Sequence, residues 1–349
     1  MNSVNPSMIT LARESRGLTQ TDFSRLLNVS QGTVSKAEQG FFVVKEEFLD
    51  SISSVLQYPR SFFYERFTIY PPSFNHHRKR KALPQKELNK INAFVNIYRH
   101  QIQKFLSSIE IDVKIPFYDV DEFDGPDEVA KQVKIVLNIP SGPIDNLTNL
   151  LEDSGILVFK VDFGTRKIDG LSVVTDVDVP IVFINEALTG DRWRFTLAHE
   201  LGHIVMHHNS IPGPEMEDEA NAFASEFLMP KNDIDYYLHQ LDLEKLAFLK
   251  RKWKVAMSAL AVRANRLATI SDNQYRYLMI KMAERGYKTR EPAEIDIPVE
   301  ETTLLKELVD FFLNELAYSI DDICKMLCIQ TDDFEHIYMG KRPRLKVVK

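Results

Sequence analysis

Two histidines stand four residues apart in the stretch RFTLAHELGH, residues 194–203, and a glutamate follows the first of them. Residues at positions i and i+4 share one face of a helix, so His199 and His203 can direct both imidazoles at one metal ion. Glu200 would then lie beside the open position of that ion, where it can take a proton from a water that attacks a peptide carbonyl. The spacing predicts a zinc-dependent hydrolase, with two histidines that share a helix face by chance as the alternative.

The residues around this pair favour a helix that is packed in a core. An apolar stripe follows the same segment, so the polar residues of the helix would point into a cavity. The stripe consists of Phe195, Leu197, Ala198, Leu201 and Ile204. His207 and His208 are expected at the solvated end of this helix, and a supporting role at the metal is the alternative for His207.

The third ligand must come from another segment, because the three-histidine pattern of metzincins is absent: position 209 is Asn, and position 206 is Met rather than Gly. The next predicted helix, EMEDEANAFASEFLMP, offers Glu217, Glu219 and Glu226. Glu217 and Glu219 are two residues apart and cannot both face the ion. The spacing from Glu217 to Asn221 resembles the E-x-x-A-[ND] pattern of zincins with a glutamate ligand. That resemblance favours Glu217, with Glu219 as the alternative, and implies that Asn221 supports a ligand from behind.

A second group of residues suited to chemistry lies in LTQTDFSRLLNVSQGTVSKAEQG, residues 18–40. Thr19 and Ser30 are suited to cap two short helices, and Gly40 ends the second helix. Leu26, Leu27 and Val29 are expected to point inward at the turn between them. This is the sequence form of a helix-turn-helix, whose second helix enters the major groove of DNA.

The exposed positions of that second helix carry side chains that can read DNA. Gln31 can make two hydrogen bonds to adenine, and Thr33 offers a hydroxyl and a methyl group. Gln20 and Lys36 are suited to phosphate, with Arg13 as a weaker candidate. The predicted DNA-contacting set is Gln20, Ser30, Gln31, Thr33 and Lys36. A small helical domain that binds protein is the alternative.

The charge balance of this segment predicts self-association. Residues 1–40 hold four basic and three acidic side chains, so the electrostatic attraction of a single copy to DNA is weak. Two copies on a palindromic operator would compensate, and we therefore expect a homodimer on double-stranded DNA.

The segment 17–40 has a counterpart near the other end of the chain. Shifted by 300 positions without a gap, it overlies AYSIDDICKMLCIQTDDFEHIYMG, residues 317–340. The capping residue, the inward apolar positions and the final glycine recur. The second helix of the copy carries Asp332, Asp333 and Glu335, and phosphate repels such a face. We expect a degenerate helix-turn-helix that does not read DNA, with a chance likeness of two short helix pairs as the alternative.

The elements that would position these residues suggest an α+β fold that is mainly helical. The predicted parts are a helix-turn-helix domain over residues 1–70, a basic segment with a long linker helix over 71–114, a zincin-like domain with a small sheet over 115–289, and a C-terminal helical region over 290–349. Three β-rich stretches lie between residues 115 and 190, namely GILVFKVDF, GLSVVTDV and PIVFINEAL. The acid-rich stretch REPAEIDIPVEE, residues 290–301, is expected to be a joint.

Composition excludes several classes of protein. A chain of 349 residues with 44% hydrophobic and 27% charged side chains is typical of a globular protein with more than one domain. Its net charge of −7 argues against a protein coated in positive charge for DNA, although a local DNA-reading face remains compatible with it. No membrane segment or secretory leader is evident, and the two cysteines, Cys324 and Cys328, suit a reducing compartment. The expected location is the cytoplasm. The basic run HHRKRK, residues 76–81, is either a solvated helix start or a phosphate contact.

Two resemblances complete this prediction. ITLARESRGLTQTDFSRLLNVSQGTVSKAEQG resembles the Xre (Cro/C1-type) repressor domain, which implies a five-helix fold and operator binding. DRWRFTLAHELGHIVMHH with EDEANAFASEFLMP resembles the ImmA/IrrE metallopeptidase-like family. That resemblance implies Zn²⁺, with His199, His203 and Glu217 as ligands and Glu200 as the catalytic residue. It implies a regulator that cleaves or senses a protein such as a repressor or toxin; the alternative is a repressor or antitoxin whose zinc site is structural, sensory or vestigial.

Overall fold

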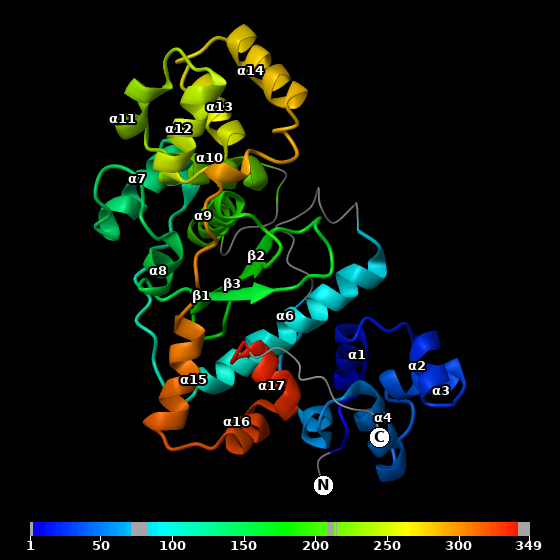
Figure 1. Ribbon diagram of the computed structural model, residues 1–349. Helices are drawn as coiled ribbons and strands as arrows, with labels where there is room; N and C mark the ends of the chain where they lie inside the picture. Colours follow the sequence, from blue (N-terminus) through cyan, green and yellow to red (C-terminus); the bar gives the residue numbers. More distant parts are fainter. Residues whose placement is uncertain (1–2, 71–82, 208–212, 214, 341–349) are drawn as a thin grey trace. The chain divides into compact units, whose positions relative to one another are not determined.

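The computed structural model describes residues 3–70, 83–207, 213 and 215–340 (Figure 1). These residues form two compact units. Unit 1 comprises residues 3–70, 83–110 and 304–340, so it joins the two ends of the described chain. Unit 2 comprises the described residues between 111 and 303.

Unit 1 begins with short helices that local capping explains. The first ones are α1 (Pro6–Ser15), α2 (Gln20–Leu26), α3 (Gln31–Glu38), α4 (Glu46–Leu56) and the 3₁₀ segment η1 (Arg60–Tyr64). Thr19 and Asp22 form a reciprocal capping box at α2, and the Ser30 side chain caps α3. These helices enclose Phe23 and Val34, whereas Leu26 is 57% exposed. The prediction that Leu26 points inward was wrong, because Phe23 and Leu27, one turn apart, occupy the inner face of α2.

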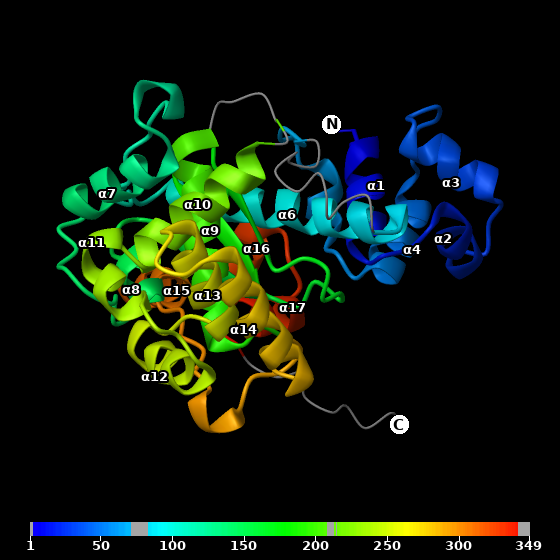
Figure 2. The same cartoon turned by 90° about the horizontal axis from the view of Figure 1, so that it is seen from above.

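The long helix α6 (Gln85–Leu106), drawn in cyan, connects both parts of unit 1 (Figure 2). It contributes Ala93 and Ile97 to the core formed by the N-terminal helices. Its later turns contact the C-terminal helix α16 (Ile320–Leu327). The Phe105 ring packs against Phe312 of α15 (Leu304–Asn314) and against Tyr338, which directly follows α17 (Thr331–Ile337). Gln101 is buried there and accepts a hydrogen bond of 2.7 Å from the Tyr338 hydroxyl.

The helices α15, α16 and α17 repeat the local design of α1, α2 and α3 at a spacing of 300 residues. Ser319 and Asp322 form a capping box on α16, as Thr19 and Asp22 do on α2. Left-handed backbone recurs at matching positions, with φ of 55° at Asn28 and 53° at Cys328. It recurs again with φ of 72° at Gly40 and 61° at Gly340. The C-terminal part thus has the helix bounds and turns of a helix-turn-helix.

Unit 2 is built on a small mixed sheet. Its strands are β1 (Leu157–Val161), β2 (Gly170–Val174) and β3 (Pro180–Asn185), in the order β1-β3-β2. β1 pairs with β3 in parallel, with Phe159 opposite Phe183, and β2 pairs with β3 in antiparallel fashion, with Ser172 opposite Val182. β3 is buried along its whole length, whereas β2 forms an edge of the sheet.

Two long helices pack together beside this sheet. α9 (Gly190–His207) contacts β2 and β3 on one side and α10 (Met216–Leu228) on the other (Figure 1). The core between them contains Leu197, Leu201 and Phe223. Further elements complete the unit: η3 (Val120–Glu122), α7 (Pro126–Val136), α8 (Leu147–Glu152), α11 (Lys231–Ile234), η4 (Asp235–Leu238), α12 (Leu243–Trp253), α13 (Met257–Arg266), α14 (Asp272–Glu284) and η5 (Ala293–Ile295).

Two of these helices, α7 and α8, lie where the strand pattern alone was predicted. α7 begins at Pro126, directly after Gly125, and acidic side chains fill its first turn, where the positive end of the helix dipole favours them. Asn146 caps the start of α8, because its side chain accepts a hydrogen bond of 3.0 Å from the Asn149 backbone amide. Both helices were missed because β-rich sequence surrounds them. In the described parts of the chain, no helix combines the length and the apolar character needed to cross a bilayer.

The acid-rich stretch 290–301 belongs to unit 2, and two of its glutamates bind it to the rest of that unit. Glu300 accepts hydrogen bonds from the backbone amides of Leu147 (3.1 Å) and Thr148 (2.8 Å), which begin α8, and it pairs with the buried Arg194 of α9. Glu291 pairs with the buried Lys250 at 2.6 Å. Gly190 is required where this stretch crosses the start of α9, because a Cβ there would lie 2.3 Å from backbone oxygens of the stretch.

Candidate metal centre and nucleic-acid interface

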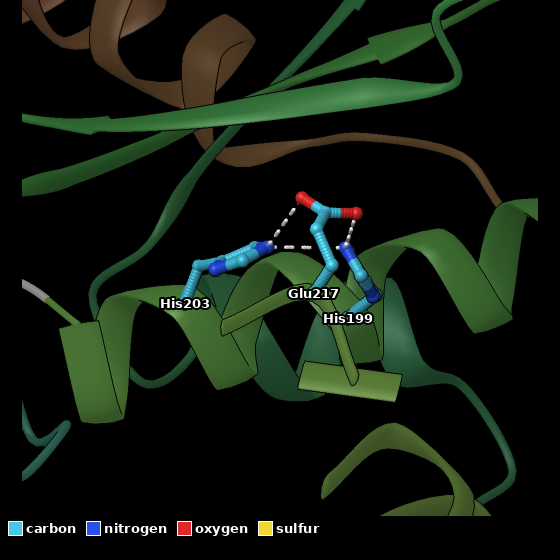
Figure 3. A group of neighbouring side chains, drawn as sticks. All are labelled: His199, His203 and Glu217. Carbon is cyan, nitrogen blue, oxygen red and sulfur yellow. Dashed lines mark hydrogen bonds and ion pairs between the residues drawn. The ribbon is translucent and has the colours of Figure 1, made fainter. Parts of the chain in front are cut away.

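Three side chains from α9 and α10 converge in unit 2 (Figure 3). The Nε2 atoms of His199 and His203 lie 3.1 Å apart, because the two residues are one helical turn apart on α9. Glu217, in the first turn of α10, places its carboxylate oxygens 3.8 Å from His199 Nε2 and 3.5 Å from His203 Nε2. One candidate ligand atom from each residue lies within 4.8 Å of the others.

The donor set and its spacing fit a zinc ion. Zinc binds imidazole nitrogen and carboxylate oxygen at about 2.0–2.2 Å in a tetrahedral arrangement, so neighbouring ligand atoms are about 3.3 Å apart. The observed separations of 3.1, 3.5 and 3.8 Å lie around that value. Three protein ligands leave one tetrahedral position for a water or a substrate, as in catalytic zinc sites.

The rear of each imidazole also has a partner. His199 Nδ1 lies 3.1 Å from the amide oxygen of Asn221, one turn after Glu217 on α10. His203 Nδ1 lies 3.0 Å from His207 Nδ1. In both rings the Nε2 atom therefore faces the shared site, and the other nitrogen is held from behind.

His207 is buried, so the expectation of a solvated helix end was wrong for this residue. Its Nε2 lies 2.9 Å from Glu219, and the packing of α10 against α9 excludes solvent from the ring. Burial, reinforced by the neighbouring His203, lowers the pKa of His207 below its usual value. His208 lies outside the described residues.

Glu200 lies beside the ligands and is almost fully buried. The Ser172 hydroxyl, on edge strand β2, donates a hydrogen bond of 2.8 Å to its carboxylate. Gly170 allows β2 to approach α9, because a Cβ at this position would lie 2.7 Å from the Thr196 side chain. Sequence reasoning missed Ser172; the available signal was a lone hydroxyl in the apolar strand GLSVV.

The three glutamates that the sequence offered as ligands have three different surroundings. Glu217 alone of them belongs to the cluster with His199 and His203. Glu219 binds His207. Glu226 pairs with Arg263, whose side chain is 1% exposed, and it also accepts from the Lys231 backbone amide at 3.2 Å.

A cavity of about 620 Å³ in unit 2 reaches the rear side of the His199 ring, where Asn221 contacts Nδ1. Phe195 on α9, Asn221 and Ala222 on α10, and Val262 on α13 contribute to its lining. Asn221 also contacts His199, so the cavity and the metal-ligand cluster share one residue. The volume is in the range of pockets that enclose a small molecule or a few side chains of a peptide.

In unit 1, α3 presents the predicted DNA-reading residues. Gln31 and Lys36 are exposed, and Thr33 is half-buried. Ser30 has a structural task, because its hydroxyl accepts from the Thr33 backbone amide at 3.1 Å and caps the helix. The residues suited to reach base edges therefore lie in the first turn of α3, as in helix-turn-helix domains.

A chain of hydrogen bonds orients Gln31. Its Nε2 donates to Gln20 Oε1 at 2.7 Å, and Gln20 Nε2 donates to Glu38 at 2.8 Å. Glu38 in turn accepts from Arg13 Nε at 2.5 Å. Arg13 is buried in this contact, so the prediction that it contacts phosphate was wrong. The basic run 76–81 lies outside the described residues.

Comparison with protein-family models supports both halves of this description. The model of the IrrE N-terminal-like domain matches residues 151–265, which include β1 to β3, α9 and α10. A helix-turn-helix model matches residues 9–63, which include α2 and α3. A search among curated proteins found no match.

Fold, site and family models together define a DNA-binding regulator that carries a metallopeptidase-type domain. More narrowly, the chain is an Xre-type helix-turn-helix domain fused to an ImmA/IrrE-type domain. Its fold is α+β and mainly helical, with a small sheet in the second domain.

Proposed function

We propose that this protein is a cytoplasmic transcription regulator whose second domain is a zinc-dependent endopeptidase. The convergence of His199, His203 and Glu217 beside Glu200 is the observation that supports it most directly. A structural zinc site normally has four protein ligands, whereas the cluster among the described residues has three. The substrate is a regulatory protein, such as a repressor or a toxin.

Zinc, when bound, acts as a Lewis acid and makes water nucleophilic near neutral pH. Glu200 takes the proton of the attacking water and passes it to the leaving amine. The hydrogen bond from Ser172 holds the Glu200 carboxylate in place for this transfer.

The first domain would direct this activity to a promoter. In our proposal, Gln31 and Thr33 contact base edges in the major groove, and Lys36 contacts phosphate. Gln20 holds Gln31 and adds a phosphate contact. Two copies bind a palindromic operator as a homodimer, which compensates for the weak charge of a single domain.

Glu200→Gln tests the catalytic part. Glutamine retains an oxygen that can accept from Ser172, so we expect the fold and the zinc content to be retained and proteolysis to be lost. Cells that carry either the wild type or the variant are compared by mass spectrometry for a protein fragment that is present only with the wild type. Equal zinc content in the two purified proteins is the control.

Production of the same fragment by the Glu200→Gln variant would contradict the role assigned to Glu200. A wild type that contains zinc but yields no fragment in any condition would favour the alternative function. In that case the protein is a repressor or antitoxin, and its metal centre is structural or sensory.

A further inference from the structure

The proposed function assigns no role to His207 and Glu219, although both lie beside the ligand cluster. His207 is the third histidine on one face of α9, one turn after His203, and its side chain is 2% exposed. Its Nδ1 lies 3.0 Å from His203 Nδ1, and its Nε2 lies 2.9 Å from Glu219 Oε2. The four groups Glu217, His203, His207 and Glu219 thus form one continuous line of contacts.

The protons along this line can be arranged in only one way when His203 binds a metal. A histidine ligand offers the lone pair of one nitrogen, and His203 directs Nε2 toward His199 and Glu217. Its proton must then reside on Nδ1, which donates to His207 Nδ1. A neutral His207 that accepts at Nδ1 holds its own proton on Nε2 and donates it to Glu219.

We propose that His207 and Glu219 are positioning residues that fix His203 in its metal-binding tautomer and orientation. Glu219 fixes the tautomer of His207, and His207 fixes that of His203. A carboxylate that acts on a ligand through a hydrogen bond also makes the ligand nitrogen a better electron donor. This inference rests on the proposed metal centre, but it does not depend on peptidase activity.

The two histidine ligands therefore have different supports. His199 is held by the neutral amide of Asn221, and His203 is held by an imidazole that a carboxylate polarises. His207 is not placed to act as a fourth ligand. Its Nδ1 faces the rear of the His203 ring, and the ligand cluster in the described chain contains only His199, His203 and Glu217.

The test measures zinc affinity of the purified full-length chain by competition with a chromogenic chelator. The variants are His207→Phe, which keeps a ring of similar size in a buried site, and Glu219→Gln, which keeps an acceptor for His207 Nε2. Loss of such a supporting partner typically weakens metal binding by about 10–100-fold. We expect a loss in that range for His207→Phe and a smaller loss for Glu219→Gln.

The double variant distinguishes a relay from two independent effects. Because Glu219 acts through His207, the loss in His207→Phe/Glu219→Gln should equal the loss in His207→Phe alone. The visible spectrum of the Co²⁺-substituted protein should also change in His207→Phe, since the His203 ring is no longer held. His239→Ala is the matched control, because it removes an exposed histidine that faces Asp235 at 3.7 Å.

Wild-type zinc affinity in His207→Phe would overturn the inference, and so would losses that simply add in the double variant. If His207→Phe does not fold, Glu219→Gln and Glu219→Ala decide the question, because Glu219 is more exposed than His207. A larger loss of zinc affinity in Glu219→Ala than in Glu219→Gln supports the relay. Wild-type zinc affinity in both variants overturns it. A wild type that binds no zinc at all would instead refute the metal centre on which the proposed function rests.

Discussion

Three glutamates on α10 have different surroundings, although they belong to one helix. Glu217 faces two histidines, Glu219 holds a third, and Glu226 forms a buried pair with Arg263. Their positions in the helix explain the separation. Residues two apart, and residues nine apart, point in nearly opposite directions, so Glu217 faces away from both Glu219 and Glu226. Glu219 and Glu226 are seven apart and share a face, but they lie about two turns apart along the helix. Composition alone assigns the same chemistry to all three.

Replacing each glutamate should therefore affect a different property. In Glu226→Ala the buried Arg263 loses its nearest carboxylate and retains only the longer contact of 3.8 Å with Asp127. Breaking such a buried pair costs about 3–5 kcal/mol of unfolding free energy. Zinc content should remain at the wild-type level. Glu217→Ala should lose zinc, while the unfolding free energy of the metal-free protein stays close to that of the wild type. Urea denaturation and elemental analysis of the purified chains measure both quantities.

A Glu226→Ala protein that is stable but lacks zinc would show that this residue had been misassigned. Glu244→Ala in the first turn of α12 is a suitable control, since it removes an exposed helical glutamate.

Much of the ligand cluster was predictable, because it depends on spacing within single helices. His199 and His203 are four apart, and Glu217 and Asn221 form a known local pattern. Apart from Asn221, the supporting contacts were not predictable in the same way. The partners of His207 and Glu200 are set by how α9 meets α10 and β2, and no local pattern encodes those contacts.

At the scale of elements, the acid-rich stretch 290–301 has contacts that its composition did not predict. Its prolines and acids are typical of a joint, yet Glu291 and Glu300 each neutralise a buried cation of unit 2. Glu300 also caps α8, a helix that the sequence did not predict. The three strands and the start of α9 lie where the apolar pattern predicted them, because β3 is buried along its whole length and α9 along most of its length.

Glu300→Ala should destabilise the protein strongly. It removes the carboxylate from Arg194, which is 0% exposed, and leaves the first amides of α8 without their acceptor. We expect a loss of about 3–5 kcal/mol in unfolding free energy. Glu301→Ala, one residue further and exposed, should change it by less than about 0.5 kcal/mol. Chemical denaturation of both variants gives the comparison, and equal stabilities would show that the stretch is not pinned as described.

A second prediction at this scale concerns acid stability in unit 1. Glu65 follows η1 and meets His100 Nε2 at 2.8 Å and Lys104 Nζ at 2.9 Å, both on α6. Burial raises the pKa of Glu65, but the hydrogen bonds from His100 and Lys104 outweigh it and lower the pKa to about 2. The ionised form is therefore favoured by folding. Its contribution is complete above pH 4.5, the ordinary value, and is lost as the pH falls toward 2.

Glu65→Gln should remove this pH dependence. The wild type should lose on the order of 2 kcal/mol more unfolding free energy than the variant between pH 4.5 and pH 2, once solvent screening is allowed for. Urea titrations at several pH values, performed on the two proteins in parallel, cancel the contributions of all other acids. Parallel curves over this range would contradict the assignment.

At the scale of the whole molecule, the chain combines two copies of one helical design with a metallopeptidase-type domain. The copies differ in the residues they present. α3 offers Gln31, Thr33 and Lys36, whereas α17 begins with Asp332 and Asp333, and Asp333 pairs with Arg16 at 2.6 Å. Phosphate repels the negative charge on the second copy, so we expect DNA recognition to depend on the first copy. The sequence revealed this repeat because capping residues and glycines kept their spacing over 300 positions.

DNA binding by the full chain should therefore be weak for one copy, steep in protein concentration and sensitive to Gln31. The operator is first selected from a random duplex library with the wild-type protein. Gln31→Ala should weaken binding to the selected site by about 1–3 kcal/mol and relax the preference at one base pair of each half-site. Lys36→Ala should weaken binding to all duplexes alike and reduce the salt slope by about one.

Glu335→Ala on α17 is the matched control and should leave DNA binding unchanged. The zinc content should equal that of the wild type in all three variants. Two chains per duplex, measured by analytical ultracentrifugation, are expected at saturation. A wild-type footprint in Gln31→Ala, or a loss of binding in Glu335→Ala, would move DNA recognition away from α3.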